Sequence, residues 1–413
     1  MNTRVIFVAA LLACVFGTTS ALADESLIPA TDSVPREYFG MHFHRAASST
    51  SIPREGVGSW RLWDARVSWR YLAEKGRTIN FSALDKLVGL ARERKLDLVY
   101  PFGATPMWAS ARPDEAGPYG PGSVAEPRDI ADWNDFVGRV ARRYKGQILN
   151  YEIWNEPNGG FFTGTLQKLV DLGCSAAPIL KAVDPNITIV SPSGVGRDPV
   201  LLSWLDKFLS LDGGRCVDVI AWHFYVPNGT PESMLATVRS VQEIMRRHGV
   251  ADKPLWNTET GWRLDLGPTD ARPIDPQWKK LDAETSPAYV ARALLIGWAA
   301  GLKRFYYYSW DHMDMGFLDV SGRTTASAEA YLRMAHWMTG AIVRNCKSEG
   351  AVWSCALERG HTVHIVAWVE DGRAQSWSVP IRTRSIENLN GTQRTIGPDG
   401  RVELSGTPVL LSP

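Results

Sequence analysis

The chain has 413 residues, of which 45% are hydrophobic, and this composition predicts a large folded core and excludes a disordered protein. Its 45 basic and 44 acidic residues almost balance, so we expect neither nucleic acid nor an anionic membrane as a partner. The length accommodates one large α/β domain and one small domain.

The amino-terminal segment, residues 1–23, has the features of a secretory signal peptide. It contains Arg4, an apolar stretch, and small residues at Ala21 and Ala23, which predicts cleavage after Ala23. The apolar stretch is short for a membrane-spanning helix, so a retained anchor is the weaker alternative. Lipidation at Cys14 ranks below plain export. We therefore expect a periplasmic or extracellular protein without stable membrane insertion.

Strand-like and helix-like segments alternate between residues 37 and 340. The expected strands are 38–43, 59–64, 96–102, 149–155, 187–192, 217–224, 254–258 and 304–310. Eight strands alternating with helices over about 300 residues predict a (β/α)₈ barrel. The alternative is an open doubly wound sheet, which normally has a glycine-rich phosphate-binding turn after its first strand, and this sequence has none there.

The pattern changes after residue 341. Short alternating segments separated by Gly, Asn and Asp predict an antiparallel, β-sandwich-like module over residues 342–413. No long low-complexity linker precedes this module. We therefore expect it to pack directly against the barrel, which we assign to residues 24–341.

Four cysteines remain after residues 1–23, and an even number in an exported protein favours disulfides. Cys346 and Cys355 flank a segment that can form a hairpin turn, so we expect them to be bonded. Cys174 then pairs with Cys216 by elimination. Buried free thiols are the alternative. The sequence has no CxxC motif and no histidine-rich cluster, so we expect no metal site.

Two glutamates follow expected strands at the positions where such a barrel carries its active site, the carboxyl ends of the strands. Glu156 follows the fourth strand, in NYEIWNEPNGG (150–160), and Glu259 follows the seventh, in LWNTETGW (255–262). A carboxylate in these places is costly to bury and unnecessary for folding. Cleavage of a glycosidic bond requires such a pair, because one carboxyl protonates the leaving oxygen while the other attacks or supports the sugar centre.

Other side chains at the strand ends suit a sugar site. An arginine and a tyrosine beside one carboxylate would keep it ionised, and indole rings offer flat faces to sugar C–H groups. The candidate substrate-binding residues are His42, His44, Arg61, Trp63, Asn155, His223, Tyr225, Trp310 and Asp311. The two histidines of the first strand could equally make local hydrogen bonds, the tryptophan of the second could be packed in the core, and its arginine could bind carbonyls inside the barrel. Segment 311–319 matches no calcium loop, so we interpret it as a sugar-contacting loop.

The motif WNEPN (154–158), with HFYVP (223–227) and Thr258-Glu259, resembles the clan A retaining glycoside hydrolases and, within that clan, family 39. The resemblance implies that Glu156 is the acid/base and Glu259 the nucleophile. It also implies that Asn155 bonds to the sugar 2-hydroxyl and that Tyr225 and Arg61 orient the nucleophile. His223 would line the same pocket, and Trp310 would form the floor of the subsite that holds the reacting sugar.

We therefore expect a retaining glycosidase without a cofactor that acts on an oligo- or polysaccharide. Export and the long loop 110–127 favour endo action on a bacterial exopolysaccharide, with exo action of the β-xylosidase type as the alternative. A carbohydrate-binding barrel without turnover is a second alternative. We expect the two carboxyls about 5–5.5 Å apart. We also expect Arg61 and Tyr225 to lower the pKa of Glu259, while that of Glu156 is raised. The sequence does not indicate the oligomeric state.

Overall fold

The structure is a computed structural model that describes residues 24–27, 31–48, 52–266, 278–380 and 382–413. The expected signal peptide, including Cys14, lies outside the described residues. Within the described part of the chain, no helix has both the length and the apolar character needed to cross a bilayer.

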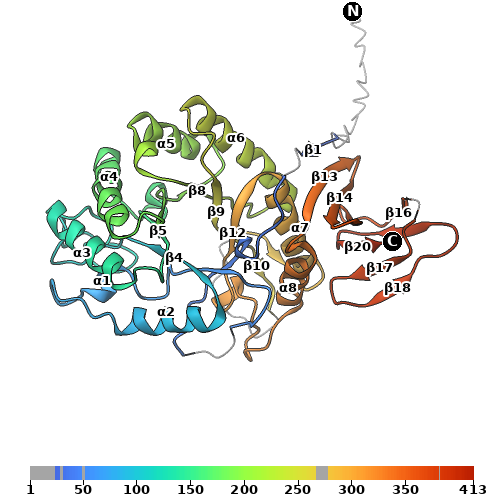
Figure 1. Cartoon of the computed structure of the whole chain (residues 1–413), viewed down its shortest axis with the longest axis horizontal. Helices are drawn as coiled ribbons and strands as arrows, with labels where there is room; N and C mark the ends of the chain where they lie inside the picture. Colours follow the sequence, from blue (N-terminus) through green and yellow to red (C-terminus); the bar gives the residue numbers. More distant parts are fainter. Residues whose placement is uncertain (1–23, 28–30, 49–51, 267–277, 381) are drawn as a thin grey trace, which may run out of the picture.

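A curled sheet of nine parallel strands forms the centre of the protein (Figure 1). In sheet order the strands are β6 (Thr188–Val190), β5 (Asn150–Glu152), β4 (Asp97–Pro101), β3 (Ser59–Arg61), β2 (Phe39–Met41), β12 (Leu302–Tyr307), β9 (Leu255–Thr260), β8 (Ile220–His223) and β7 (Gly194–Val195). β6 and β7 are two parts of one interrupted strand, and a bridge between Val190 and Val219 closes the sheet. The eight expected strands are present and the (β/α)₈ barrel is confirmed.

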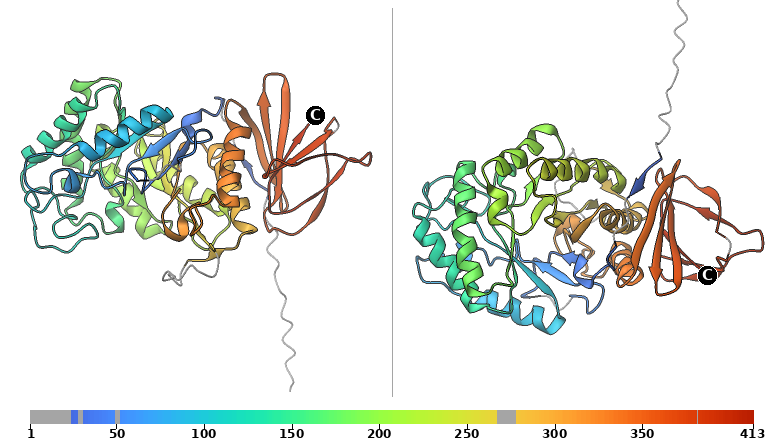
Figure 2. Two further views of the ribbon diagram at one scale, coloured as in Figure 1. Left: turned by 90° about the horizontal axis from the view of Figure 1, so that it is seen from below. Right: turned by 45° about the horizontal axis from the view of Figure 1, so that its top comes forward.

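Helices alternate with these strands and surround the sheet (Figures 1 and 2). They are α1 (Trp69–Leu72), α2 (Ser82–Arg94), α3 (Ile130–Arg143), α4 (Leu166–Val183), α5 (Pro199–Ser210), α6 (Met234–Arg247), α7 (Thr285–Ala299) and α8 (Ala326–Met338). Local sequence explains where several of them begin. The Asp198 side chain accepts hydrogen bonds from two amides at the start of α5, where Pro199 occupies the first helical position. Asp129 caps α3 by accepting a hydrogen bond from the Ala131 amide.

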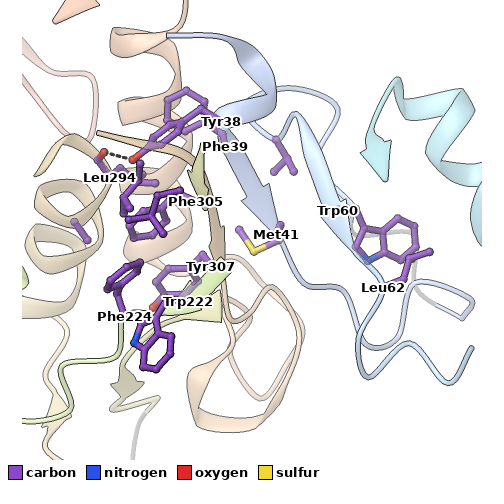
Figure 3. Close-up of a cluster of buried hydrophobic side chains, with 14 of the residues drawn as sticks. Tyr38, Phe39, Met41, Trp60, Leu62, Trp222, Phe224, Leu294, Phe305 and Tyr307 are labelled. Atoms are coloured by element: carbon purple, nitrogen blue, oxygen red, sulfur yellow. Dashed lines mark hydrogen bonds between the residues drawn. The ribbon is translucent and has the colours of Figure 1, made fainter. Parts of the chain in front are cut away.

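Aromatic side chains fill the space between the sheet and its helices (Figure 3). Tyr38, Phe305 and Tyr307 are all fully buried. The Tyr38 hydroxyl donates a hydrogen bond to the Leu294 carbonyl of α7 at 2.7 Å, so its one polar atom is paired. Burial of each such ring removes roughly 150–250 Å² from water. This packing stabilises β2 and β12, whose carboxyl ends contribute to the site described below.

A seven-stranded antiparallel sheet follows the barrel in the chain. Its order is β1 (Ser26–Leu27), β13 (Ile342–Glu349), β14 (Val352–Arg359), β15 (Thr362–Val369), β20 (Val409–Ser412), β17 (Ser385–Asn388) and β18 (Gln393–Thr395). β16 (Gln375–Ser378) and β19 (Arg401–Leu404) form a separate pair, and Val402 and Leu404 of β19 join a small core with residues of the larger sheet.

The strand β1 is a correction to our sequence-based boundaries. We assigned residues 24–341 to the barrel, but Ser26 and Leu27 pair with Lys347 and Cys346 of β13. The two-residue strand therefore covers the outer edge of the C-terminal sheet, where unpaired backbone groups of β13 would otherwise remain exposed. The two remaining short strands, β10 (Arg263–Leu264) and β11 (Lys280–Leu281), pair with each other.

The C-terminal sheet packs against the side of the barrel that carries α7 and α8 (Figure 1). Arg292 of α7 forms a buried ion pair with Glu232. The indole of Trp368 on β15 donates a hydrogen bond to the same carboxylate at 2.8 Å. Separation of the two parts would remove this hydrogen bond and uncover the buried ion pair, both of which are unfavourable.

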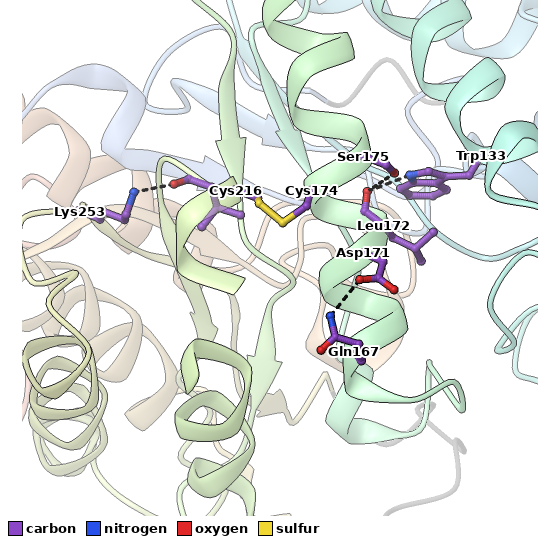
Figure 4. The surroundings of a disulfide bond; sticks show 9 residues. Trp133, Gln167, Asp171, Leu172, Cys174, Ser175, Cys216 and Lys253 are labelled. Atoms are coloured by element: carbon purple, nitrogen blue, oxygen red, sulfur yellow. Dashed lines mark hydrogen bonds between the residues drawn. A yellow bond between two sulfur atoms is a disulfide. The ribbon is translucent and has the colours of Figure 1, made fainter. Parts of the chain in front are cut away.

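Both disulfides are formed with the pairing given in the sequence analysis. Cys174 of α4 is bonded to Cys216 of η3 (Gly213–Cys216), and this bond connects two elements on the outside of the barrel (Figure 4). Cys346 is bonded to Cys355 across the β13–β14 hairpin.

Candidate active site

Glu156 and Glu259 lie at the carboxyl ends of β5 and β9. Glu156 has a φ of 39°, an uncommon left-handed conformation for a residue with a Cβ atom. Its amide donates a hydrogen bond to the Ser193 carbonyl at 2.8 Å, and Pro157 begins the short helix η2 (Pro157–Gly159) immediately afterwards. Such strained positions persist where the surroundings hold them, often in functional sites.

The two carboxyls lie close together beside one histidine. One oxygen of each carboxyl and a ring nitrogen of His223 all lie within 4.8 Å of one another. His223 Nδ1 is 2.7 Å from Glu156 Oε1 and 4.0 Å from Glu259 Oε1. The carboxyls of retaining glycosidases are about 5–5.5 Å apart and those of inverting enzymes about 6.5–9.5 Å apart. The observed approach agrees with the retaining arrangement.

Arg61 of β3 connects the pair to the interior of the barrel. Its guanidinium is fully buried and donates from Nη1 to Glu259 Oε2 at 3.0 Å and from Nη2 to Asn155 Oδ1 at 2.7 Å. Its Nε and Nη2 also donate to the two oxygens of Glu152, at 2.6 and 2.7 Å. On the other side, the Tyr225 hydroxyl donates to Glu259 Oε1 at 2.8 Å. Both oxygens of Glu259 are therefore held.

Burial raises the pKa of both glutamates. The pKa of Glu156 rises to about 7, because desolvation outweighs the attraction of Arg61. The pKa of Glu259 also rises to about 7, because desolvation and the neighbouring Glu156 outweigh the opposing effects of His223, Arg61 and Tyr225. We expected a lowered pKa for Glu259, and this expectation was wrong. Burial also lowers the pKa of His223 to about 4, so this imidazole is neutral at pH 7.

The comparisons with known proteins agree with this geometry. The family model described as "Glycosyl hydrolases family 39" matches residues 55–300, more than half of the chain.

The chain belongs to glycosyl hydrolase family 39.

It is therefore a glycosidase with the retaining mechanism of that family, and its substrate is a carbohydrate. None of the curated proteins matches the chain.

Solved structures similar to this family 39 enzyme extend over almost all of it. A family 39 glycoside hydrolase from the gut symbiont Bacteroides cellulosilyticus WH2 has a TM-score of 0.72 and 17% identity, covering 92% of this chain and 81% of that one. A monomeric β-xylosidase from Caulobacter crescentus CB15 has a TM-score of 0.66 and 16% identity, covering 93% and 97%. A family 39 enzyme from Xanthomonas axonopodis pv. citri has a TM-score of 0.65 and 16% identity, covering 94% and 95%. At these identities the likeness shows a common fold.

The group formed by Glu156, His223 and Glu259 has the ligand types of a metal site. The permanent charge of Arg61, 3.0 Å from Glu259, makes it an unfavourable place for a second cation.

Glu152 is part of this site and was not among the residues expected from the sequence. Its side chain is fully buried, and the Ser193 hydroxyl donates to its Oε1 at 2.6 Å in addition to the contacts with Arg61. The sequence signal that could have identified Glu152 is its position as a charged residue in an otherwise apolar strand before WNEPN. A buried carboxylate there requires a buried cation nearby.

Two expected substrate contacts, His42 and Asp311, have other surroundings in the structure. His42 Nε2 is 3.0 Å from the Thr258 carbonyl and the side chain is fully buried, which is the local hydrogen bonding left open above. The oxygens of Asp311 accept hydrogen bonds from the amides of His44 and Arg45, at 2.7 and 2.9 Å. Asp311 therefore holds the segment that follows β2, and its acceptors are occupied.

Trp310 does not lie where we expected the floor of a sugar subsite. Its side chain is 1% exposed and packs against Phe43 and Phe317, with ring centroids 6.0 Å apart in both cases. Tyr308, two residues earlier, is the aromatic residue of this segment that lines an open groove.

This groove, which we call the aromatic groove, has a volume of about 460 Å³. The residues that line it include His44, Trp63, Asp64, Tyr71, Tyr119 and Tyr308. It lies near the glutamate pair, because Trp63 follows Arg61 by two residues and the Tyr308 amide donates a hydrogen bond at 2.8 Å to the carbonyl of Thr260, the residue after Glu259. The hydroxyls of Tyr119 and Tyr308 both donate to the Asp64 carboxylate, at 2.5 and 3.0 Å.

Only two residues of the aromatic groove, His44 and Trp63, were predicted from the sequence as substrate contacts. Tyr119 and Tyr308 come from loops whose paths the sequence pattern does not reveal, and Tyr71 comes from α1. A larger hollow, of about 1280 Å³, is lined by residues that precede strands, such as Arg36 and Lys95, and so belongs to the end of the barrel away from the pair.

Proposed function

We propose that this family 39 glycosidase cleaves a polysaccharide by double displacement, with Glu259 as the nucleophile and Glu156 as the acid/base. The observation that carries the assignment is the difference between the two carboxyls. Glu259 accepts hydrogen bonds on both oxygens, from Tyr225 and Arg61, which orients it for attack. Glu156 is held on one oxygen, by His223, and its other oxygen has no protein partner among the described residues.

In the first step, Glu259 attacks the anomeric carbon while the bond from that carbon to the leaving oxygen breaks. Glu156 transfers its proton to the leaving oxygen, so the departing group leaves as a neutral alcohol. In the second step, a water molecule gives a proton to the Glu156 carboxylate and attacks the anomeric carbon, which releases Glu259. The raised pKa of Glu156, about 7, supports its role as the acid, because it carries a proton near neutral pH.

Asn155 suits a contact with the sugar 2-hydroxyl. Its Oδ1 accepts a hydrogen bond from Arg61, which orients the side-chain amide and leaves the NH₂ group to donate. A donor fixed beside Glu259 favours a hydrogen bond that strengthens as the transition state forms.

The aromatic groove supports a polymeric substrate. Its lining includes the rings of Tyr119 and Tyr308, on whose faces sugar C–H groups can stack. We infer endo action from this open groove. The disulfides support export, because such bonds persist in oxidising compartments. A solved structure with a TM-score of 0.65 is described as a conserved exported protein from Bacteroides fragilis.

A panel of chromogenic aryl glycosides, followed by a panel of polysaccharides, tests the proposal. We expect turnover of at least one substrate by the wild type and none by Glu259→Ala. An early series of oligosaccharides from the polymer supports endo action. Monosaccharide as the sole early product would instead establish an exo-acting enzyme, and equal rates for the wild type and Glu259→Ala would refute the catalytic assignment.

A further inference from the structure

We propose that Glu152 is a positioning residue of the reaction. Its carboxylate fixes the orientation of the Arg61 guanidinium and balances the positive charge of that group. Arg61 can then orient Glu259 while its positive charge is already balanced by Glu152. This inference rests on the proposed roles of Glu156 and Glu259. It concerns a residue that does not touch the sugar and acts through Arg61.

The geometry shows which carboxylate holds Arg61 more strongly. Glu152 accepts two hydrogen bonds from the guanidinium, at 2.6 and 2.7 Å, whereas Glu259 accepts one at 3.0 Å. Paired, bidentate contacts between arginine and a carboxylate are the stronger kind. Both partners of the bidentate pair have side chains that are 0% exposed, so water does not screen it.

The arrangement also fixes where Arg61 points. The strands β3 and β5 are both neighbours of β4, and the bidentate contact locks the guanidinium plane across the inside of the sheet. In this orientation Nη1 reaches Glu259 and Nη2 reaches Asn155. The Ser193 hydroxyl completes the arrangement with a hydrogen bond to Glu152 at 2.6 Å.

The charges around the pair explain the consequence. Arg61 is the permanent cation that contacts the pair, and Glu152 matches its charge, so neither negative charge of a fully ionised pair is compensated by an arginine. The other groups that act on Glu259 or Glu156 come from several elements: His223 and Tyr225 at the end of β8, Asp64 after β3, and Tyr119 and Tyr308 from loops. Burial keeps this imidazole and these phenols neutral at pH 7.

The pair therefore tends to keep one proton near neutral pH. This agrees with the pKa of each glutamate, which burial raises to about 7 although a guanidinium lies 3.0 Å from Glu259. A single retained proton is what double displacement needs, with one carboxyl ionised for attack and the other protonated for the leaving group.

Replacement of Glu152 by glutamine tests the inference, because it keeps the size of the side chain and removes its charge. The uncompensated charge of Arg61 should then favour the ionised forms of Glu156 and Glu259. We expect both limbs of the pH profile of kcat/KM to move to lower pH by about one unit. The matched control is Asp97→Asn, which removes the carboxylate from a second arginine pair, with Arg304 at 2.9 Å, that is only partly buried, and should leave both limbs in place.

A folded Glu152→Gln enzyme with the wild-type pH profile would overturn the inference. If that variant does not fold, Glu152→Asp provides the test, because it keeps the charge but shortens the side chain. We expect it to keep both limbs in place while kcat falls by at least about tenfold through displacement of Arg61. Wild-type kcat in Glu152→Asp would overturn the inference. These outcomes differ from failure of the proposed function, which would show as retained activity in Glu259→Ala.

Discussion

Arg61 Nη1 lies 3.0 Å from Glu259 Oε2, yet the pKa of Glu259 is raised. From the sequence, an arginine beside a carboxylate predicts the opposite shift. Burial of the carboxyl and the proximity of Glu156 outweigh the attraction, and the guanidinium is already bound by Glu152. The distance between a carboxylate and an arginine therefore does not by itself predict the pKa of the carboxylate, when a second carboxylate binds that arginine more tightly.

The first prediction is the pH dependence of activity. Each glutamate has a pKa of about 7, and two such close groups lose their protons in steps that belong to the pair. Because the reaction needs one proton on the pair, kcat/KM should give a bell-shaped curve with its limbs on either side of about pH 7. Initial rates from pH 4.5 to 9 provide the measurement. A plateau that continues down to pH 4.5 would mean that Glu259 stays ionised, as the sequence alone suggests.

The second prediction separates the two proposed roles. Glu259→Ala should abolish turnover of every glycoside. Glu156→Ala should still form the glycosyl-enzyme from substrates with good leaving groups, and added azide should then restart the stalled second step and give a glycosyl azide of retained configuration. Product analysis by NMR distinguishes the outcomes. Azide rescue of Glu259→Ala with retained configuration would reverse the assignment.

The third prediction concerns stability. In the unfolded chain Glu259 has the ordinary pKa of 4.5, whereas in the folded protein its pKa is about 7, so the folded state binds more protons between these values. The free energy of unfolding should therefore fall as pH rises from 4.5 to 7, by on the order of 3 kcal/mol for this group. The Glu259→Gln variant has no titrating carboxyl at this position, so its free energy of unfolding should not show this decrease.

Denaturant unfolding of the wild type and Glu259→Gln at pH 5 and pH 8 measures the effect. Relative to the wild type, the variant should be more stable at pH 8 than at pH 5. An equal difference at both values would show that the pKa of this carboxyl is not raised in the folded protein.

The fourth prediction concerns the disulfides. The Cys174–Cys216 bond closes a loop of 42 residues and the Cys346–Cys355 bond a loop of 9. In the loop-entropy description these contribute about 4 and about 2.6 kcal/mol respectively. The double replacement Cys174→Ser/Cys216→Ser should therefore lower the free energy of unfolding more than Cys346→Ser/Cys355→Ser. Alkylation without reductant, read by intact mass, should label no cysteine of the mature protein.

Several features of this protein follow from the sequence alone. The apolar strand segments and their turn residues predicted eight strands in the right order, because each strand is defined by residues next to one another in the chain. Glu156 and Glu259 were predicted to meet because the carboxyl ends of strands in a closed parallel barrel lie at one end of it. The contacts of Arg61 and Tyr225 with Glu259 were implied by the resemblance to family 39, and the structure contains both.

Other features were decided by the tertiary structure. Glu152 and Arg61 are 91 residues apart, and their pairing depends on both side chains pointing into the barrel. Trp310 is buried because Phe43 and Phe317 pack against it, and Tyr308 lines the groove in its place. The protonation of the glutamate pair depends on desolvation, which is a property of everything packed around a group. Patterns along a chain report which residues are present at the strand ends, whereas burial and competing partners are settled only when distant segments come together.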